Sequence, residues 1–153
     1  MRQTVEEMLG YFNQIRRVYA NEVNLKFTNE NFSPNEISIL ILLSNNPSIN
    51  TSSQLCTILG VSKGLISRSI DVLVEKGYII CAKDDADKRI QRLSFSPQAA
   101  PVIQKLNEEV TKMNNEVLQD FSIEELQQVE ATMTKILTRF KERNETQHEK
   151  NNV

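Results

Sequence analysis

The residues best suited to chemistry in this chain are basic and hydroxyl side chains between residues 62 and 68. Ser62, Lys63, Ser67 and Arg68 lie off the apolar stripe of a helical segment, in its N-terminal half. Lys and Arg bind phosphate through charge, Ser exchanges hydrogen bonds with phosphates and bases, and helix N–H groups add to the attraction for anions. The segment therefore suits contact with nucleic acid, and a solvated helix face is the alternative.

A second charged segment, KDDADKRIQRLSFS, occupies residues 83–96. Three acids, three bases and one Ala come first, and a short stretch without helical period follows. Lys88 and Arg92 are candidate phosphate contacts in it, whereas Asp84 and Asp85 are expected to face solvent. Acidic side chains at such a surface would repel nucleic acid unless they position a neighbouring Lys or Arg side chain.

Charge is unevenly distributed along the 153 residues. The whole chain carries −2, but residues 51–96 hold seven bases and five acids, a local charge of +2, between segments of −1 and −3. Phosphate binding depends on local potential, so the middle segment is compatible with a nucleic-acid surface. No apolar run is long enough to span a membrane, and the start MRQTVEEMLGYF does not look like a signal peptide, so we expect a cytoplasmic protein.

Other chemistries lack the residues they need. Cys56 and Cys81 are too far apart for a CxxC pair, and the only histidine is His148, so we expect no metal site and no cofactor. There is no internal His that could act as the general base for a nucleophile, and there is no GxSxG, Walker A or GxGxxG pattern. Both observations argue against an enzyme. Redox sensing by either cysteine is a minor alternative, because a buried thiol is usually inert.

Helix start signals organise the N-terminal part of the chain. Apolar residues spaced four, three and four apart predict a helix over about residues 4–28. These residues are Met8, Phe12, Ile15 and Tyr19. Ser33 and Pro34 then predict the start of a buried helix, EISILILLS, with Ser33 as cap and Glu36 as the acid of a capping box.

The next segment has the pattern of a helix-turn-helix. Thr51 as cap and Gln54 three residues later predict a short helix that ends at Gly60. Ser62 then caps a second helix, which ends at Gly77. Two helices joined by a tight turn with Gly are typical of DNA-binding proteins in which the second helix enters the major groove.

The hydrophobic period then changes from helical to alternating. YIICA (78–82) and RIQRLSF (89–95) predict two strands of a hairpin, with KDDADK as the connecting loop. Ser96 and Pro97 predict another helix start, which Pro101 should kink or delay. The helix after it carries a heptad seam, and Ser122 with Glu125 predicts a capping box before the last helix.

These elements predict a mainly α fold with a small β-hairpin wing. The expected divisions are an N-terminal dimerisation helix (1–32), a winged helix-turn-helix lobe (33–96), C-terminal dimerisation helices (97–143) and a polar tail (144–153). Two heptad seams and an apolar first helix exceed what one small lobe can cover, so we expect a homodimer. The candidate dimerisation residues are Met8, Val129, Met133, Ile136 and Phe140.

The order of elements and several local patterns resemble the MarR family of winged helix-turn-helix transcription regulators. The most specific segments are QLCTILGVSKGLISRSIDVLVEKGYI (54–79) and DKRIQRLSFS (87–96), which matches the wing pattern D-R-R-x-x-x-L-x-L-T. FSPNEISIL (32–40) also resembles the family segment L-T-x-x-Q-x-x-V-L. Cys81 and Ala82 depart from the family, which commonly has arginines on this strand.

The resemblance implies a site for double-stranded DNA. Arg89 would enter the minor groove, with Asp87 as its positioning partner, although Asp87 could also be a simple turn residue. Gly64 would let the backbone approach DNA, and Thr51, more often a cap, could touch phosphate. The predicted DNA-binding residues are Thr51, Ser62, Lys63, Gly64, Ser67, Arg68, Asp87, Lys88, Arg89 and Arg92.

The same resemblance implies a function and a regulator site. We expect a repressor that binds a pseudo-palindromic operator as a homodimer and responds to a small-molecule effector. In the family the first helix lines the effector cleft, although packing is the alternative for each candidate. The effector candidates are Tyr11, Phe12, Ile15 and Tyr19. The alternative functions are a winged-helix interaction module that has lost DNA binding and a cysteine-based redox regulator.

Overall fold

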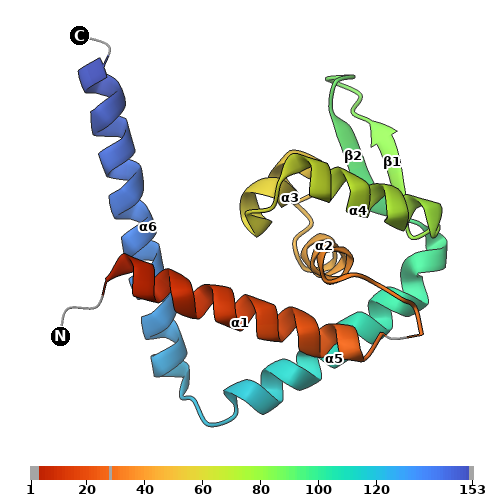
Figure 1. Cartoon of the computed structure of the whole chain (residues 1–153), viewed down its shortest axis with the longest axis horizontal. Coiled ribbons are helices and arrows are strands. Elements are labelled where there is room, and N and C mark those ends of the chain that lie inside the picture. Colours follow the sequence, from red (N-terminus) through yellow and green to blue (C-terminus); the bar gives the residue numbers. More distant parts are fainter. Residues whose placement is uncertain (1–3, 28, 152–153) are drawn as a thin grey trace. The chain divides into compact units, whose positions relative to one another are not determined.

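The computed structural model describes residues 4–27 and 29–151, with side chains up to Gln147. It confirms the predicted fold class, because the described chain is mainly helical and has one two-stranded antiparallel hairpin (Figure 1). The helices are α1 (Val5–Leu25), α2 (Pro34–Asn45), α3 (Ser52–Leu59), α4 (Lys63–Glu75), α5 (Ala100–Leu118) and α6 (Ile123–Asn151). The strands are β1 (Ile79–Lys83) and β2 (Gln91–Phe95), and a 3₁₀ turn, η1 (Pro97–Ala99), precedes α5.

The chain forms two compact units, Met1–Lys112 and Met113–Val153, with the boundary inside α5. In the first unit α2 packs against α1, α3 and α4, and α4 packs against α3 and β1 (Figure 1). The core of this unit is apolar and fully buried. Its largest members are Val23, Phe27, Ile37, Ile39, Leu40, Leu55, Ile66, Leu73 and Leu106. This core fixes the helix-turn-helix on a rigid base, as function at its surface requires.

The start of α2 differs from the prediction in one respect. Ser33 caps the helix by accepting from the Glu36 N–H (3.2 Å), as expected. The Glu36 carboxylate does not close a capping box: it pairs with Lys76 Nζ at 2.8 Å and is buried. Lys76 also donates to the Asn31 carbonyl oxygen (3.0 Å). A full charge from α4, 40 residues later in the chain, therefore outcompetes a backbone N–H for this carboxylate.

The entry into α5 shows the effect of its two prolines. Residues Pro97–Ala99 form a 3₁₀ turn, and the α-helix starts at Ala100, which agrees with the late start predicted from Pro101. Ser96 stands at the N-cap position of the 3₁₀ turn, as the predicted helix start implies, but its side chain makes no capping hydrogen bond. Its hydroxyl donates to the Gly77 carbonyl oxygen instead, and so ties the start of α5 to the turn between α4 and β1.

The second unit is the end of α5, a short turn and the long helix α6. The predicted capping box is confirmed, since Ser122 N donates to Glu125 Oε2 (2.8 Å) and Glu125 N donates to Ser122 Oγ (3.2 Å). α6 continues through residues 144–151 of the predicted polar tail, a segment without Pro or Gly, and residues 152 and 153 lie outside the described chain. Many apolar side chains of this unit are exposed: Val117, Leu118, Phe121, Ile123, Leu126, Val129, Leu137 and Phe140.

Candidate nucleic-acid interface

The helix-turn-helix forms with the caps that the sequence predicted. Thr51 and Gln54 make a complete capping box at the start of α3, and Gly60 ends that helix in the left-handed conformation (φ 62°). Ser62 then accepts from the Leu65 N–H (3.3 Å) and starts α4. Gly77 (φ 80°) ends α4, with Tyr78 N bonded back to the Leu73 carbonyl oxygen (3.0 Å).

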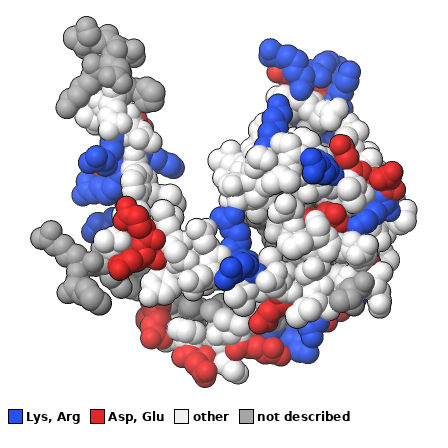
Figure 2. Space-filling model, viewed as in Figure 1, with Lys and Arg blue, Asp and Glu red and all other residues white. Residues whose placement is uncertain are grey.

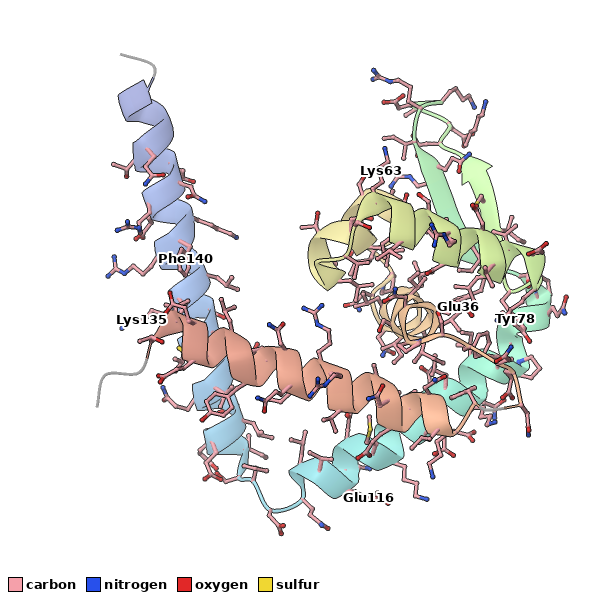
Figure 3. The ribbon with its side chains drawn as sticks, viewed as in Figure 1. Glu36, Lys63, Tyr78, Glu116, Lys135 and Phe140 are labelled. Atoms are coloured by element: carbon pink, nitrogen blue, oxygen red, sulfur yellow. The ribbon has the colours of Figure 1, made fainter. Side chains whose placement is uncertain are left out.

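α4 presents its predicted contact residues at one exposed end. Ile66, Ser69, Ile70 and Leu73 form its buried face. Ser62, Lys63, Gly64 and Arg68 are exposed, and Ser67 is half-buried at the edge of that face. In Figure 3 Lys63 points away from the core, to the side on which the tip of the hairpin projects. The N-terminus of α4 thus combines free helix N–H groups with two cations on an open surface.

Gly64 has a distinct role at this surface. A Cβ built on it would meet no atom within 4 Å, so the packing of the protein does not require a glycine there. Glycine in a helix costs stability relative to Ala. The open space leaves room for a close approach to the α4 backbone at this position.

The hairpin is antiparallel, with Ile79 opposite Phe95 and Lys83 opposite Gln91. A carboxylate side chain holds the loop of the hairpin in its turn conformation. Asp84 accepts from the N–H groups of Ala86 (3.1 Å) and Asp87 (3.0 Å), and its backbone N–H donates to the Ile90 carbonyl oxygen (2.8 Å). Loop residues with short carboxylate side chains commonly hold turns in this way. The expectation that Asp84 faces solvent is wrong, because its side chain is 20% exposed and fully engaged.

Asp87 and Arg89 form the pair that the resemblance predicted. Arg89 donates from Nε to Asp87 Oδ1 and from Nη2 to Asp87 Oδ2, both at 3.1 Å, and its backbone N–H donates to Asp87 Oδ1 at the same distance. The hydrogen bonds from Arg89 lower the pKa of Asp87, and Asp87 raises the pKa of Arg89. The Arg89 side chain is nonetheless 91% exposed, so it is a held but accessible cation at the hairpin tip.

The remaining predicted contacts have different surroundings. Lys88 is exposed and lies 3.8 Å from Asp85, a loose surface pair. Arg92 is engaged within the protein, by Asp84 (2.9 Å) and by Asn50 (2.9 Å). Thr51 Oγ1 serves the capping box of α3. Figure 2 shows basic side chains gathered at the tip of the hairpin, while Asp84 and Asp87 bind groups of the loop and Asp85 is exposed.

Asn50 and Asp84 are the site residues that the sequence reasoning missed. The Asn50 carbonyl oxygen accepts from Leu93 N (2.8 Å), which joins β2 to the residue before the α3 cap. For Asp84 the signal was present, since an Asp two or three residues before the turn's centre commonly binds turn N–H groups. For Asn50 no local signal exists, because the partners of its side-chain and carbonyl oxygens, Arg92 and Leu93, are distant in the chain, Arg92 by 42 residues.

The two cysteines do not fit a reactive pair. Cys56 is half-buried, and Cys81 on β1 is exposed, which corrects the assumption that both are buried. Partial burial and the nearby Asp71 carboxylate raise the pKa of Cys81. A raised pKa leaves less of the nucleophilic thiolate, which disfavours a redox sensor at this position.

The predicted effector residues do not share one environment. On α1, Phe12 and Tyr19 are half-buried, and burial raises the pKa of Tyr19. Tyr11 and Ile15 are 65% and 62% exposed. A shallow cavity of about 500 Å³ in the same unit is lined by β2 and α5 instead. Its residues are Phe95, Ser96, Ala100, Ile103, Gln104, Asn107 and Glu108.

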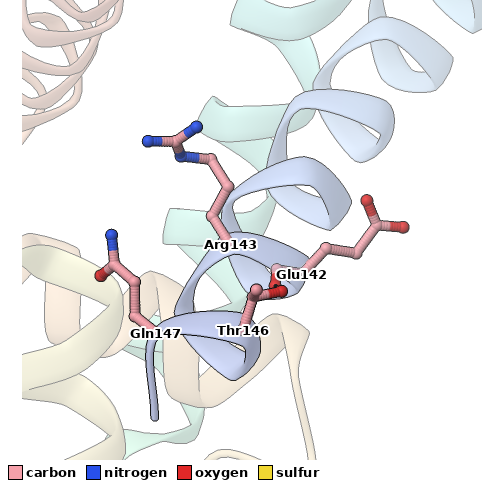
Figure 4. A pocket seen from close by; sticks show the side chains of 4 residues that line it. All are labelled: Glu142, Arg143, Thr146 and Gln147. Atoms are coloured by element: carbon pink, nitrogen blue, oxygen red, sulfur yellow. Dashed lines mark hydrogen bonds between the residues drawn. The ribbon is translucent and has the colours of Figure 1, made fainter. Parts of the chain in front are cut away.

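The predicted dimerisation residues vary in exposure. Val129 and Phe140 on α6 are 58% and 47% exposed, and Met8, Met133 and Ile136 are half-buried. Leu118, Phe121, Leu126 and Val129 line an apolar depression of about 390 Å³ around the α5–α6 turn. A second depression, farther along α6, is lined by Glu142, Arg143, Thr146 and Gln147 (Figure 4). All four come from one helix, so it is an open polar surface.

The described residues offer neither a cluster of metal ligands nor a membrane-spanning helix. No group of three or more His, Cys, Asp or Glu side chains there could hold a metal ion. No helix in the described ranges is long and apolar enough to cross a membrane.

The helix-turn-helix followed by a two-stranded hairpin defines a winged-helix protein. Residues 30–90 match the family model described as the MarR family. The matched segment contains the helix-turn-helix and the hairpin loop, and the match confirms the resemblance predicted from the sequence.

Several solved structures share the fold over most of the chain. The transcriptional regulator BldR from Sulfolobus solfataricus is 28% identical, with 90% of this chain and 99% of that chain covered and a TM-score of 0.65. A MarR-family transcriptional regulator from Silicibacter pomeroyi is 22% identical (90% and 96% covered, TM-score 0.72). A MarR protein from Peptoclostridium difficile is 21% identical (92% and 91% covered, TM-score 0.71). The last two matches establish similarity of fold.

Proposed function

We propose that this protein is a sequence-specific DNA-binding transcription regulator in which α4 reads the major groove and the hairpin enters the minor groove. The observation that carries the proposal is the pairing of two exposed cationic elements on one lobe. Lys63 and Arg68 lie at the open end of α4, and Arg89 is held by Asp87 at the hairpin tip. An Arg presented singly on a narrow element suits the concentrated negative potential of a narrow A·T-rich minor groove.

The proposal includes a homodimer on a pseudo-palindromic operator. Exposed apolar side chains on α6, such as Val129 and Phe140, form a surface that a helix from a second copy would cover. α1 has its own exposed apolar stripe, with Tyr11, Ile15 and Val18 more than half exposed. A two-fold dimer would place two α4 helices in successive major grooves roughly 34 to 36 Å apart.

Regulation by a small molecule, with repression as the default state, completes the proposal. Such a dimer would have two arrangements, one in which the DNA-binding lobes are spaced to fit the operator and one in which they are not. An effector can change operator affinity only by as much as its own binding free energy differs between these two arrangements. Phe12 and Tyr19 of α1, which are half-buried, are the better candidates for such a site than the exposed Tyr11 and Ile15. A ligand that raises the melting temperature of wild type but not of the Tyr19→Ala variant would support this part; equal shifts would oppose it.

Capture of genomic fragments by the full-length protein, followed by sequencing, tests the function as a whole. A DNA-binding regulator enriches fragments that share an inverted repeat. A winged-helix interaction module, favoured by the net charge of −2 and by Cys81 and Ala82 in place of strand arginines, enriches none. The Arg68→Ala/Arg89→Ala variant is the control, since it removes one cation from each of the two cationic elements.

Lys63→Ala should weaken operator binding in a salt-dependent way. Each phosphate contact releases counterions, so loss of one contact from each copy of the proposed dimer should reduce the slope of log affinity against log salt concentration by about 2. Titrations by fluorescence anisotropy at several salt concentrations measure this slope. Lys112→Ala, which removes an equal charge from α5, should leave it unchanged, and an unchanged slope for Lys63→Ala would argue against a phosphate contact.

Gly64→Ala should separate stability from DNA binding. The variant should be more stable by about 0.5 kcal/mol, because a helical Gly costs backbone entropy and no atom obstructs the new methyl group. Operator affinity should nevertheless fall, because the methyl group stands where the DNA backbone approaches. Urea unfolding and anisotropy measure the two effects. Unchanged or improved affinity would place DNA away from this end of α4.

A further inference from the structure

Arg92 connects parts of the lobe that are distant in sequence. It lies on β2 directly opposite Ala82 of β1, a small residue that brings no like charge across the strand pair. Its Nε donates to Asp84 Oδ1 at 2.9 Å, and its Nη1 donates to Asn50 Oδ1 at 2.9 Å. The guanidinium is a rigid planar fork, so two acceptors on different elements fix its direction. Arg92 therefore joins the hairpin loop to the turn before α3.

Asn50 is fixed on the helix-turn-helix side of this connection. Its backbone N–H donates to Gln54 Oε1 (2.9 Å), the same oxygen that accepts from the Thr51 N–H in the α3 capping box. Its carbonyl oxygen accepts from Leu93 N (2.8 Å), the residue next to Arg92. The side-chain oxygen that receives Arg92 is thus anchored on both sides by backbone and cap bonds.

Asp84 is fixed on the hairpin side. One carboxylate oxygen accepts from Arg92, and the other accepts from the N–H groups of Ala86 and Asp87. The hydrogen bond from Arg92 is the main reason that the pKa of Asp84 is lowered. Asp87 in turn holds Arg89 through two bonds of 3.1 Å. An unbroken series of hydrogen bonds therefore runs from the start of α3 to the side chain at the hairpin tip.

We propose that Arg92 is a positioning residue: through Asp84 and Asn50 it fixes the loop that carries Asp87 and Arg89 relative to the helix-turn-helix, and it does not contact phosphate. This inference rests on the proposed function, in which Arg89 enters the minor groove. Binding two grooves at once requires the two cationic elements to keep a set separation, and a hairpin held before binding avoids the cost of ordering it on DNA.

Arg92→Lys distinguishes a positioning residue from a phosphate contact. Lys keeps the charge and serves phosphate well, but its single ammonium on a flexible stem cannot reproduce the fork to Asp84 and Asn50. The positioning role predicts that operator affinity falls about tenfold, because the loosened loop must then be ordered on DNA. Affinity equal to wild type would overturn the proposal.

Asp84→Asn and Asp85→Asn form a matched pair in which the same negative charge is removed from adjacent residues. The amide of D84N can still accept from the two loop N–H groups, but it turns a donor towards Arg92. D84N should therefore weaken DNA binding although it removes a charge that repels phosphate. Asp85 is exposed and makes only the loose pair with Lys88, so D85N should bind at least as tightly as wild type. D84N binding as tightly as D85N would contradict the positioning role.

Hydrogen exchange of backbone amides gives a readout that does not depend on DNA. Arg92→Lys and D84N should speed exchange at residues 84–90, while amides in α2 and α4 keep wild-type protection, which separates a loosened hairpin from a destabilised lobe. Unchanged exchange at residues 84–90 would overturn the proposal even if DNA binding fell. Faster exchange there in a protein that captures no DNA would support the positioning role and count against the proposed function.

A double-variant experiment shows whether Arg92 acts through the hairpin tip. In an Arg89→Ala background, Arg92→Lys should cost little further affinity, because the side chain that it positions is gone. Additive losses would mean that Arg92 meets DNA by itself, and would overturn the assignment.

Discussion

Arg89→Ala is expected to weaken operator binding by about 1 to 3 kcal/mol while the protein stays folded and dimeric. The Arg89 side chain is 91% exposed, and among the described residues it bonds to Asp87 of its own loop, so its loss removes little that stabilises the fold. On DNA the same guanidinium would enter the minor groove, where potential is most negative over A·T-rich sequence. The loss should therefore be larger on an operator with A·T-rich flanks than on one with G·C-rich flanks.

Fluorescence anisotropy with both operators at physiological salt measures this loss. Lys83→Ala is the matched control, because it removes one positive charge from the same hairpin, at the last residue of β1 and not in the loop that carries Arg89. It should cost clearly less than Arg89→Ala. The assignment of Arg89 to the minor groove would be contradicted if Arg89→Ala bound the operator about as tightly as wild type. It would also be contradicted if Arg89→Ala and Lys83→Ala lost operator affinity equally.

Val129→Glu is expected to have the second large effect, on assembly. Val129 is 58% exposed in the single chain, and Glu is a good helix former, so α6 should remain folded. In a dimer that covers this seam, each copy would bury an unpaired carboxylate, which costs several kcal/mol. The variant should be monomeric at concentrations where wild type is a dimer, and it should lose more affinity for a full operator than for a half-site.

Sedimentation equilibrium at several concentrations measures this change. Thr134→Glu supplies the control, since it adds the same charge to α6 at an exposed position off the seam. That variant should remain dimeric. A dimeric Val129→Glu protein would place the interface elsewhere. A monomeric wild-type protein would contradict the proposed homodimer.

The sequence predicted well those features that depend on residues close together in the chain. Thr51 with Gln54, Gly60 and Ser62 set the bounds of α3 and α4, because caps and left-handed turns are local chemistry. The change of period after Gly77 predicted the hairpin for the same reason. The Asp87–Arg89 pair came from the resemblance to the family, and its two members are only two residues apart.

Features that depend on distant partners were missed. Glu36 fits the local pattern of a capping box, but Lys76 captures its carboxylate from 40 residues away. Arg92 looks like any exposed strand cation until the fold brings Asn50 to it across 42 residues. In each case a charged group took a tertiary partner that no sequence period encodes.

Hydroxyl-radical footprinting of wild type and Arg89→Ala on a captured operator tests the central claim most directly. The account predicts that wild type protects two segments about one helical turn apart, each with an adjoining protected stretch of minor groove. Arg89→Ala should keep the two segments at saturating protein and lose the adjoining minor-groove protection. Identical footprints for the two proteins, or no discrete footprint for wild type, would contradict the assignment of α4 and the hairpin as the DNA-reading elements.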